Sequence, residues 1–162
     1  MWSTYEKNQT REEERRTASH NTVVIDGLEQ TDVWGGFRVG RRAQPNIIED
    51  SRYLLEASHN GYQYNQIRHA RKWILNKQSV EIVDNVDGNK ELSLAYFHFN
   101  PQLNIKQIED GIFVFDDITL IFSHFYSLRK ELFTFCAGFN KIELSTRLIV
   151  SFTRILNTKF KV

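Results

Sequence analysis

The chain has 162 residues, a formal net charge of +1 and one cysteine. This length is sufficient for one domain with a buried core, and the balanced charge without a long basic tract gives no reason to expect nucleic-acid binding. The lone Cys136 excludes an intramolecular disulfide, and no apolar run reaches the ~20 residues of a membrane-spanning helix or forms a signal-peptide core.

Residues 1–19 form a charged lead-in segment that includes "REEERR" at 11–16. Six charged residues do not make a stable helix in water by themselves, so we expect a solvated turn or a short helix here. The alternative is a surface that meets another domain or an anionic ligand.

From Asn21 onward the pattern is typical of strands. The β-branched run "TVVI" covers residues 22–25, and Gly35, Gly36 and Gly40 favour bulges or close backbone approaches rather than a helix. Asn60-Gly61 predicts a hairpin. The other expected turns are Asp26-Gly27, Asn76-Lys77 and Asp87-Gly88.

Short apolar or alternating runs continue to the end of the chain. In 92–97, Leu92, Leu94 and Tyr96 alternate with Ser93, Ala95 and Phe97. Strand signals recur about every 8–12 residues, which is typical of an all-β antiparallel sandwich. We therefore predict a single β-sandwich domain over residues 1–162, with the phenylalanines between its sheets and Cys136 buried.

The five histidines do not show the spacing of a known metal motif. His98 and His124 lie within strand-like aromatic runs and are interpreted as structural. By contrast, His20, His59 and His69 lie at predicted strand ends, where a scaffold displays functional groups. A zinc site assembled from distant strands stays open, because histidine and aspartate are suitable ligands.

Arginines gather near these histidines. Their planar forks suit carboxylates and sulfates, so this edge fits a polyanionic sugar. The alternative is that they form ion pairs with Glu49, Asp50 or Glu56. The arginines are Arg38, Arg41, Arg42, Arg68 and Arg71.

Several blocks of the chain together resemble the C-terminal β domain of the heparinase II/III-like polysaccharide lyases. "RRTASHNTVVIDG" matches an R-s-T-x-x-H-N-T-v pattern with its Asp-Gly turn, and "QTDVWGGFRVGRRA" matches Q-s-x-x-W-x-x-F-R-v-G-R-x-A. "ASHNGY" resembles H-D-G-Y with Asn60 in place of the aspartate. The segments "IRHARKWIL", "IVDNVDG" and "FHFNP" resemble later parts of the family pattern.

This resemblance implies a β-sandwich fold and β-elimination on polysaccharides that contain uronic acids. In the family the site lies between an N-terminal α/α-toroid and the β domain. The toroid has no counterpart in this sequence, so we expect a fragment or truncated form of a carbon–oxygen lyase, inactive alone. Its expected partners are an acidic polysaccharide and the missing toroid domain, and a homodimer stays open.

The resemblance also implies roles for particular residues. His20 and Tyr62 match catalytic positions, and His20 and His59 match positions that bind a structural zinc in some members. The expected substrate contacts are Asn21, Arg38, Arg41, Arg68, His69 and Arg71.

Two other interpretations stay open at this point. One is a module that binds acidic glycans without chemistry, and the other is a purely structural β-sandwich domain. Heparin-like glycans, alginate and bacterial exopolysaccharides all contain uronates, so the sequence does not select the substrate. The resemblance favours a bacterial parent protein of the periplasm or cell envelope.

Overall fold

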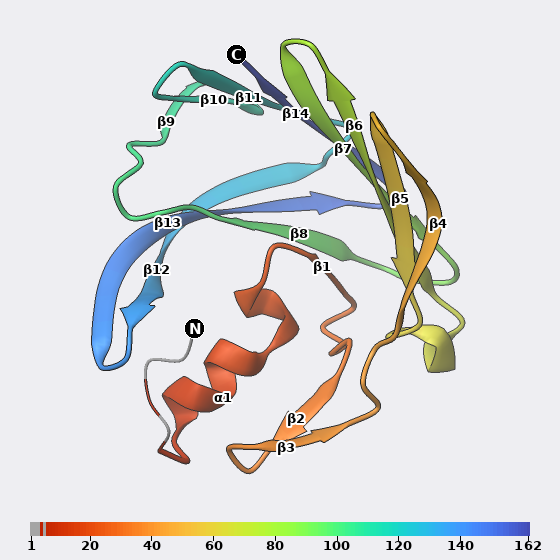
Figure 1. The fold of residues 1–162 in the computed structure, drawn as a ribbon, viewed down its shortest axis with the longest axis vertical. Coiled ribbons are helices and arrows are strands. Elements are labelled where there is room, and N and C mark those ends of the chain that lie inside the picture. Colours follow the sequence, from red (N-terminus) through yellow and green to blue (C-terminus); the bar gives the residue numbers. More distant parts are fainter. Residues whose placement is uncertain (1–3, 5) are drawn as a thin grey trace.

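The computed structural model describes residue 4 and residues 6–162 (Figure 1). The elements of this part are α1 (Gln9–Arg15), η1 (Thr17–Ser19), β1 (Val23–Ile25), β2 (Asp32–Trp34), β3 (Arg38–Gly40), β4 (Pro45–Ser51), β5 (Leu54–His59), η2 (Gln63–Asn65), β6 (Arg68–Asn76), β7 (Ser79–Asp87), β8 (Ser93–His98), β9 (Lys106–Glu109), β10 (Ile112–Phe115), β11 (Ile118–Ser123), β12 (Ser127–Gly138), β13 (Lys141–Phe152) and β14 (Ile155–Lys161).

The described strands form two large antiparallel sheets and one separate hairpin. The eight-stranded sheet has the order β4-β5-β6-β7-β14-β11-β10-β9, and the four-stranded sheet has the order β1-β8-β13-β12. β2 pairs with β3 alone. This arrangement confirms the predicted all-β antiparallel sandwich.

The main core lies between the two sheets. β1, β8 and β13 contribute one wall, and β10, β11 and β14 contribute the opposite wall. Half of the twelve phenylalanines pack in this core, several of them edge to face. They are Phe97, Phe99, Phe113, Phe115, Phe122 and Phe152.

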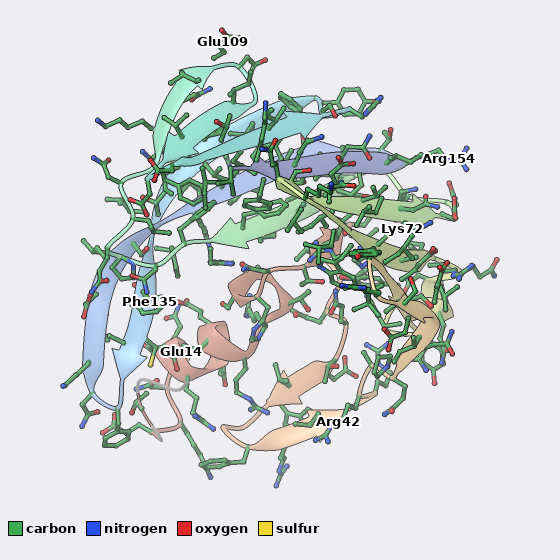
Figure 2. All side chains as sticks on the ribbon, turned by 45° about the horizontal axis from the view of Figure 1, so that its top comes forward. Glu14, Arg42, Lys72, Glu109, Phe135 and Arg154 are labelled. Carbon is green, nitrogen blue, oxygen red and sulfur yellow. The ribbon has the colours of Figure 1, made fainter. Side chains whose placement is uncertain are left out.

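β8 separates this core from a second, smaller one. Ala95 and Phe97 point into the main core, whereas Tyr96 joins a cluster with Ile149 of β13 and Ala18 of η1. Figure 1 shows α1 on that second side of the four-stranded sheet, and Figure 2 shows Phe135 of β12 there, toward Glu14. The predicted alternation of β8 is confirmed, and its outer face packs against the N-terminal segment.

The lead-in contains a short helix rather than an entirely solvated turn. The Asn8 side chain caps α1 by accepting a hydrogen bond from the Arg11 backbone N–H at 3.0 Å. The Arg11 side chain is buried, and its Nε donates to the Gly36 carbonyl at 2.8 Å. Residues 1–3 and 5 of the lead-in lie outside the described part of the chain.

The Asp26-Gly27 turn is confirmed. Both residues have positive φ, 48° and 70°. The Asp26 carboxylate also accepts hydrogen bonds from the backbone N–H groups of Glu91 and Leu92, which secures this turn against the residues before β8.

The hairpin predicted at Asn60-Gly61 is confirmed as a pairing of β5 with β6, but its tight turn is not. β5 and β6 do pair, but η2 interrupts the connection between His59 and Arg68. The reason is visible at Asn60, whose Oδ1 accepts a hydrogen bond from the Gln44 backbone N–H at 2.7 Å instead of closing a tight turn.

Two further sequence expectations concern Cys136 and membrane-spanning helices. Cys136 is half-buried on β12, at the edge of the four-stranded sheet, so the expectation of a buried thiol is wrong. Within the described residues, none of the helices is both long and apolar enough to cross a membrane.

Candidate functional site

Asn21 links the two sheets through hydrogen bonds. Its backbone carbonyl accepts from Arg71 Nη1 at 2.7 Å, and Arg71 lies on β6 of the eight-stranded sheet. Its side-chain Oδ1 accepts from the His98 backbone N–H at 2.7 Å and lies 3.1 Å from His98 Nδ1. The ladder between β1 and β8 begins at Val23 and Ala95. The asparagine side chain therefore supplies an acceptor just beyond the end of the backbone ladder.

Two histidines and an aspartate follow one another across β5, β6 and β7. The Gly61 backbone N–H donates to His59 Nδ1 at 3.1 Å. His59 Nε2 lies 3.2 Å from His69 Nδ1, and His69 Nε2 lies 2.7 Å from Asp84 Oδ1. Because His59 Nδ1 accepts a hydrogen bond, the proton of each ring is assigned to Nε2. His59 then donates to His69, and His69 donates to Asp84.

The register of the sheet creates this order. His59 of β5 lies opposite His69 of β6, and Arg71 of β6 lies opposite Asp84 of β7. Side chains that face each other across antiparallel strands are within contact distance, so four residues from three strands meet on one face.

The polar network is the name we give to His59, His69, Arg71, Asp84 and Asn21. Asp84 is fully buried, and Arg71 binds both of its oxygens, with Nε at 2.7 Å from Oδ1 and Nη2 at 3.0 Å from Oδ2. A buried carboxylate requires this kind of bidentate, charge-assisted pairing.

Electrostatics within the polar network agree with these protonation states. Burial lowers the pKa of His59 to about 4, and the positive charge of Arg71 acts in the same direction, so the ring is neutral at pH 7. For Asp84, burial raises the pKa, but the charge of Arg71 and the hydrogen bonds from His69 and Arg71 outweigh it and hold the pKa below its usual value.

Tyr62 lies in the main core beside this network. The residue is 1% exposed, and its hydroxyl donates to the Val23 carbonyl at 2.8 Å. Its ring contacts His59, with centroids 5.5 Å apart. Burial raises the pKa of the hydroxyl well above its usual value. This placement favours a structural role for Tyr62 over the predicted catalytic one.

His20 immediately precedes Asn21 and is exposed. Its backbone N–H donates to the Thr17 carbonyl at 3.1 Å, and its carbonyl accepts from the Thr22 N–H at 2.9 Å, so the backbone is held on both sides. Partial desolvation of the ring lowers the pKa of His20. The exposed, neutral imidazole can accept or donate a proton at pH 7.

His98 was interpreted from sequence as a core histidine, but it is only half-buried. Its ring stacks on Tyr96 and meets Phe133 edge-on, with centroids 6.1 Å and 4.7 Å away. Burial, then the charges of Arg147 and His20, lower its pKa to about 4. His20 and His98 thus lie near each other on the outer side of the four-stranded sheet.

The remaining predicted arginines lie outside the polar network. Arg38 and Arg68 are exposed at the starts of β3 and β6. Arg41 pairs with Asp32 through Nε and Nη2, and this hydrogen bonding lowers the pKa of Asp32. The expected alternative, ion pairs with Glu49, Asp50 or Glu56, identified the wrong partners: Arg41 and Arg71 pair with aspartates, and Glu56 pairs with Lys72.

The predicted zinc ligands do not fit a metal site. No group of three or more histidine, cysteine, aspartate or glutamate residues within the described ranges could hold a metal ion. Both ring nitrogens of His59 are engaged with Gly61 and His69.

The profile of the family "Heparinase II/III-like, C-terminal" matches residues 2–162. The chain belongs to this family. A comparison with curated protein sequences found no match.

Two solved structures show the same fold as this heparinase II/III-like domain. The heparan sulfate lyase HepC from Pedobacter heparinus is 14% identical, with a TM-score of 0.71. A heparinase III with methylated lysines is 15% identical, with a TM-score of 0.68. The match covers 99% of this chain in both cases and 27% of each neighbour, so the domain spans about a quarter of their length.

Sequence reasoning missed two residues of this arrangement, Asp84 and His98. Asp84 lies at an inward position of β7, two residues before the buried Val86, and a carboxylate in such a place signals a buried partner. The contact of His98 with Asn21 joins residues that are 77 positions apart in the sequence, so no local pattern predicts it.

Proposed function

We propose that this chain is the β domain of a polysaccharide lyase and that its His20–Asn21 segment forms one wall of the elimination site. Membership of the heparinase II/III-like family supports a lyase origin. The observation that carries the location is the exposed His20 ring next to Asn21, whose backbone and side chain are bonded to both sheets.

The proposed reaction is β-elimination on a glycan that contains uronic acid. A base removes the proton at C5 of the uronate, the electron pair forms the C4–C5 double bond, and the glycosidic oxygen at C4 leaves and takes up a proton. The C5 proton is only weakly acidic, so the site must stabilise the charge that develops on the carboxylate.

His20 would act in this reaction by proton transfer or by hydrogen bonding to the carboxylate. The lowered pKa of its ring favours the neutral imidazole at pH 7 over a fixed positive charge. The other groups that elimination requires would come from an N-terminal domain, because no second acid–base side chain in the described part of the chain is hydrogen-bonded to His20.

A structural role is the second candidate function. The observation in its favour is that Arg41 and Arg71 are both engaged by aspartates rather than open to a polyanion. Arg38, Arg41, Arg42 and Arg68 are the exposed arginines of the predicted set. Since Arg41 pairs with Asp32, glycan binding would depend on the other three.

The experiment is a binding titration of the chain with heparan sulfate and alginate oligosaccharides, with absorbance recorded for the unsaturated product. We expect weak, salt-sensitive binding to one uronate glycan, reduced by His20→Ala, and no absorbance rise. Binding to neither glycan would favour the structural role. An absorbance rise with the chain alone would contradict the need for a second domain.

A further inference from the structure

We propose that Arg71 and Asp84, with His69 and His59 behind them, are positioning residues that fix the His20–Asn21 segment. Under this assignment Arg71 and His69 do not make the substrate contacts that the sequence had predicted, but act through the segment. It rests on the proposed function only in assuming that His20 contacts a substrate. The geometric part stands by itself, because it concerns contacts within the chain.

The first argument is that all three side-chain nitrogens of Arg71 are bound within the domain. Nε and Nη2 bind the two oxygens of Asp84, and Nη1 binds the Asn21 carbonyl. The guanidinium group is therefore fixed by the Asp84 carboxylate, and its third nitrogen reaches the backbone of the segment.

The second argument is that Asp84 is in turn oriented. His69 Nε2 lies 2.7 Å from the same Oδ1 that Arg71 Nε binds, and His69 is itself 3% exposed. A buried carboxylate with three hydrogen bonds has one orientation. The hydrogen bonds continue from His69 to His59 of β5 and from His59 to the Gly61 N–H.

The third argument is that Asn21 is hydrogen-bonded to both sheets. Its carbonyl is bound by β6 and its Oδ1 by the His98 N–H of β8. The Thr22 carbonyl also accepts from the Tyr96 N–H at 2.9 Å. The His20 ring is thus the exposed end of a segment whose backbone is bonded to both sheets.

The test uses the chain itself with two variants of strand β6. Arg71→Lys keeps a positive charge beside Asp84, but an ammonium group cannot reproduce the planar fork, so the bond to Asn21 is lost. Lys72→Gln is the matched control, because it breaks the neighbouring ion pair with Glu56. Amide and imidazole NMR resonances and heparan sulfate binding are measured for both variants.

We expect Arg71→Lys to shift the resonances of His20, Asn21 and His98 and to weaken binding about tenfold, the effect of one charge-assisted hydrogen bond. Lys72→Gln should do neither. Resonances that move only along β6 and β7 would overturn the positioning role. Moved His20 resonances with unchanged binding would instead keep the positioning of the segment and refute its contact with glycan.

Should Arg71→Lys fail to fold, Asn21→Ala serves as the second variant. It leaves the bond from Arg71 to the backbone carbonyl and removes only the link to His98. We expect the His98 resonances to move and those of His20 to move less. Equal shifts at His20 and His98 would contradict a constraint that comes from Arg71.

Discussion

Two arginine–aspartate pairs in this domain have the same chemistry and different surroundings. Arg71 and Asp84 have side chains that are 11% and 0% exposed, whereas those of Arg41 and Asp32 are 48% and 37% exposed. Water screens the second pair and competes for its hydrogen bonds, whereas the first pair is largely shielded from water. Arginines that form one cluster in the sequence can therefore differ in burial, so that some are structural and others lie at the surface.

The largest effect is expected at the buried pair. Arg71→Ala leaves Asp84 charged and uncompensated in the core, so the free energy of unfolding should fall by about 3–5 kcal/mol. Urea unfolding at pH 7 measures it. A fall of less than about 1 kcal/mol would mean that Asp84 is not buried as a carboxylate in solution.

Lowering the pH should reduce the free energy of unfolding before Asp84 becomes protonated. His59 and His98 have pKa values of about 4 in the folded state and 6.5 as the ordinary value, so the unfolded chain binds more protons between these limits. Their stabilisation is complete above pH 6.5 and is lost progressively as the pH falls to 4.

The measurement is the urea midpoint against pH for the wild type and for His59→Gln. We expect a decline from pH 6.5 to 4 in the wild type and a shallower decline in the variant. The lowered pKa of Asp84 confines its own effect to lower pH. A flat wild-type profile over the histidine range would contradict buried neutral rings.

Tyr62→Phe is expected to have a smaller effect. The change removes one hydrogen bond to the Val23 carbonyl, which also accepts from Gln30 Nε2 at 3.1 Å, so the loss should be about 1 kcal/mol. Glycan binding should be unchanged. Loss of binding in a folded variant would restore Tyr62 to the functional site.

The smallest effect is expected at the exposed pair. Arg41→Ala should leave the urea midpoint nearly unchanged at high salt, because Arg41 and its partner Asp32 are both accessible to water. A large loss that persists at high salt would show that the β2–β3 hairpin depends on this pair.

The sandwich could be predicted from sequence because each strand carries its own local signal. Alternation in β8 assigned Ala95 and Phe97 to one face and Tyr96 to the other, and the turn at Asp26-Gly27 followed from its residue types. The tight turn predicted at Asn60-Gly61 is not formed, and the Asn60 side chain instead binds Gln44, a partner that no local pattern supplies.

The site could be predicted only in part for a related reason. His59, His69 and Arg71 were identified as members of one region, but their contacts depend on strand register and on Asp84, which the sequence reasoning did not consider. Burial then changes what these residues can do. Arg71 was expected to contact substrate, and its three bound nitrogens are instead occupied within the domain.

The most direct test of this account is NMR mapping of the chain during titration with a heparan sulfate tetrasaccharide. Since the elimination wall is proposed at His20 and Asn21, the perturbed resonances should cluster there and at His98. Perturbations confined to the lysine-rich end formed by Lys77, Lys159 and Lys161, away from His20, would contradict the account.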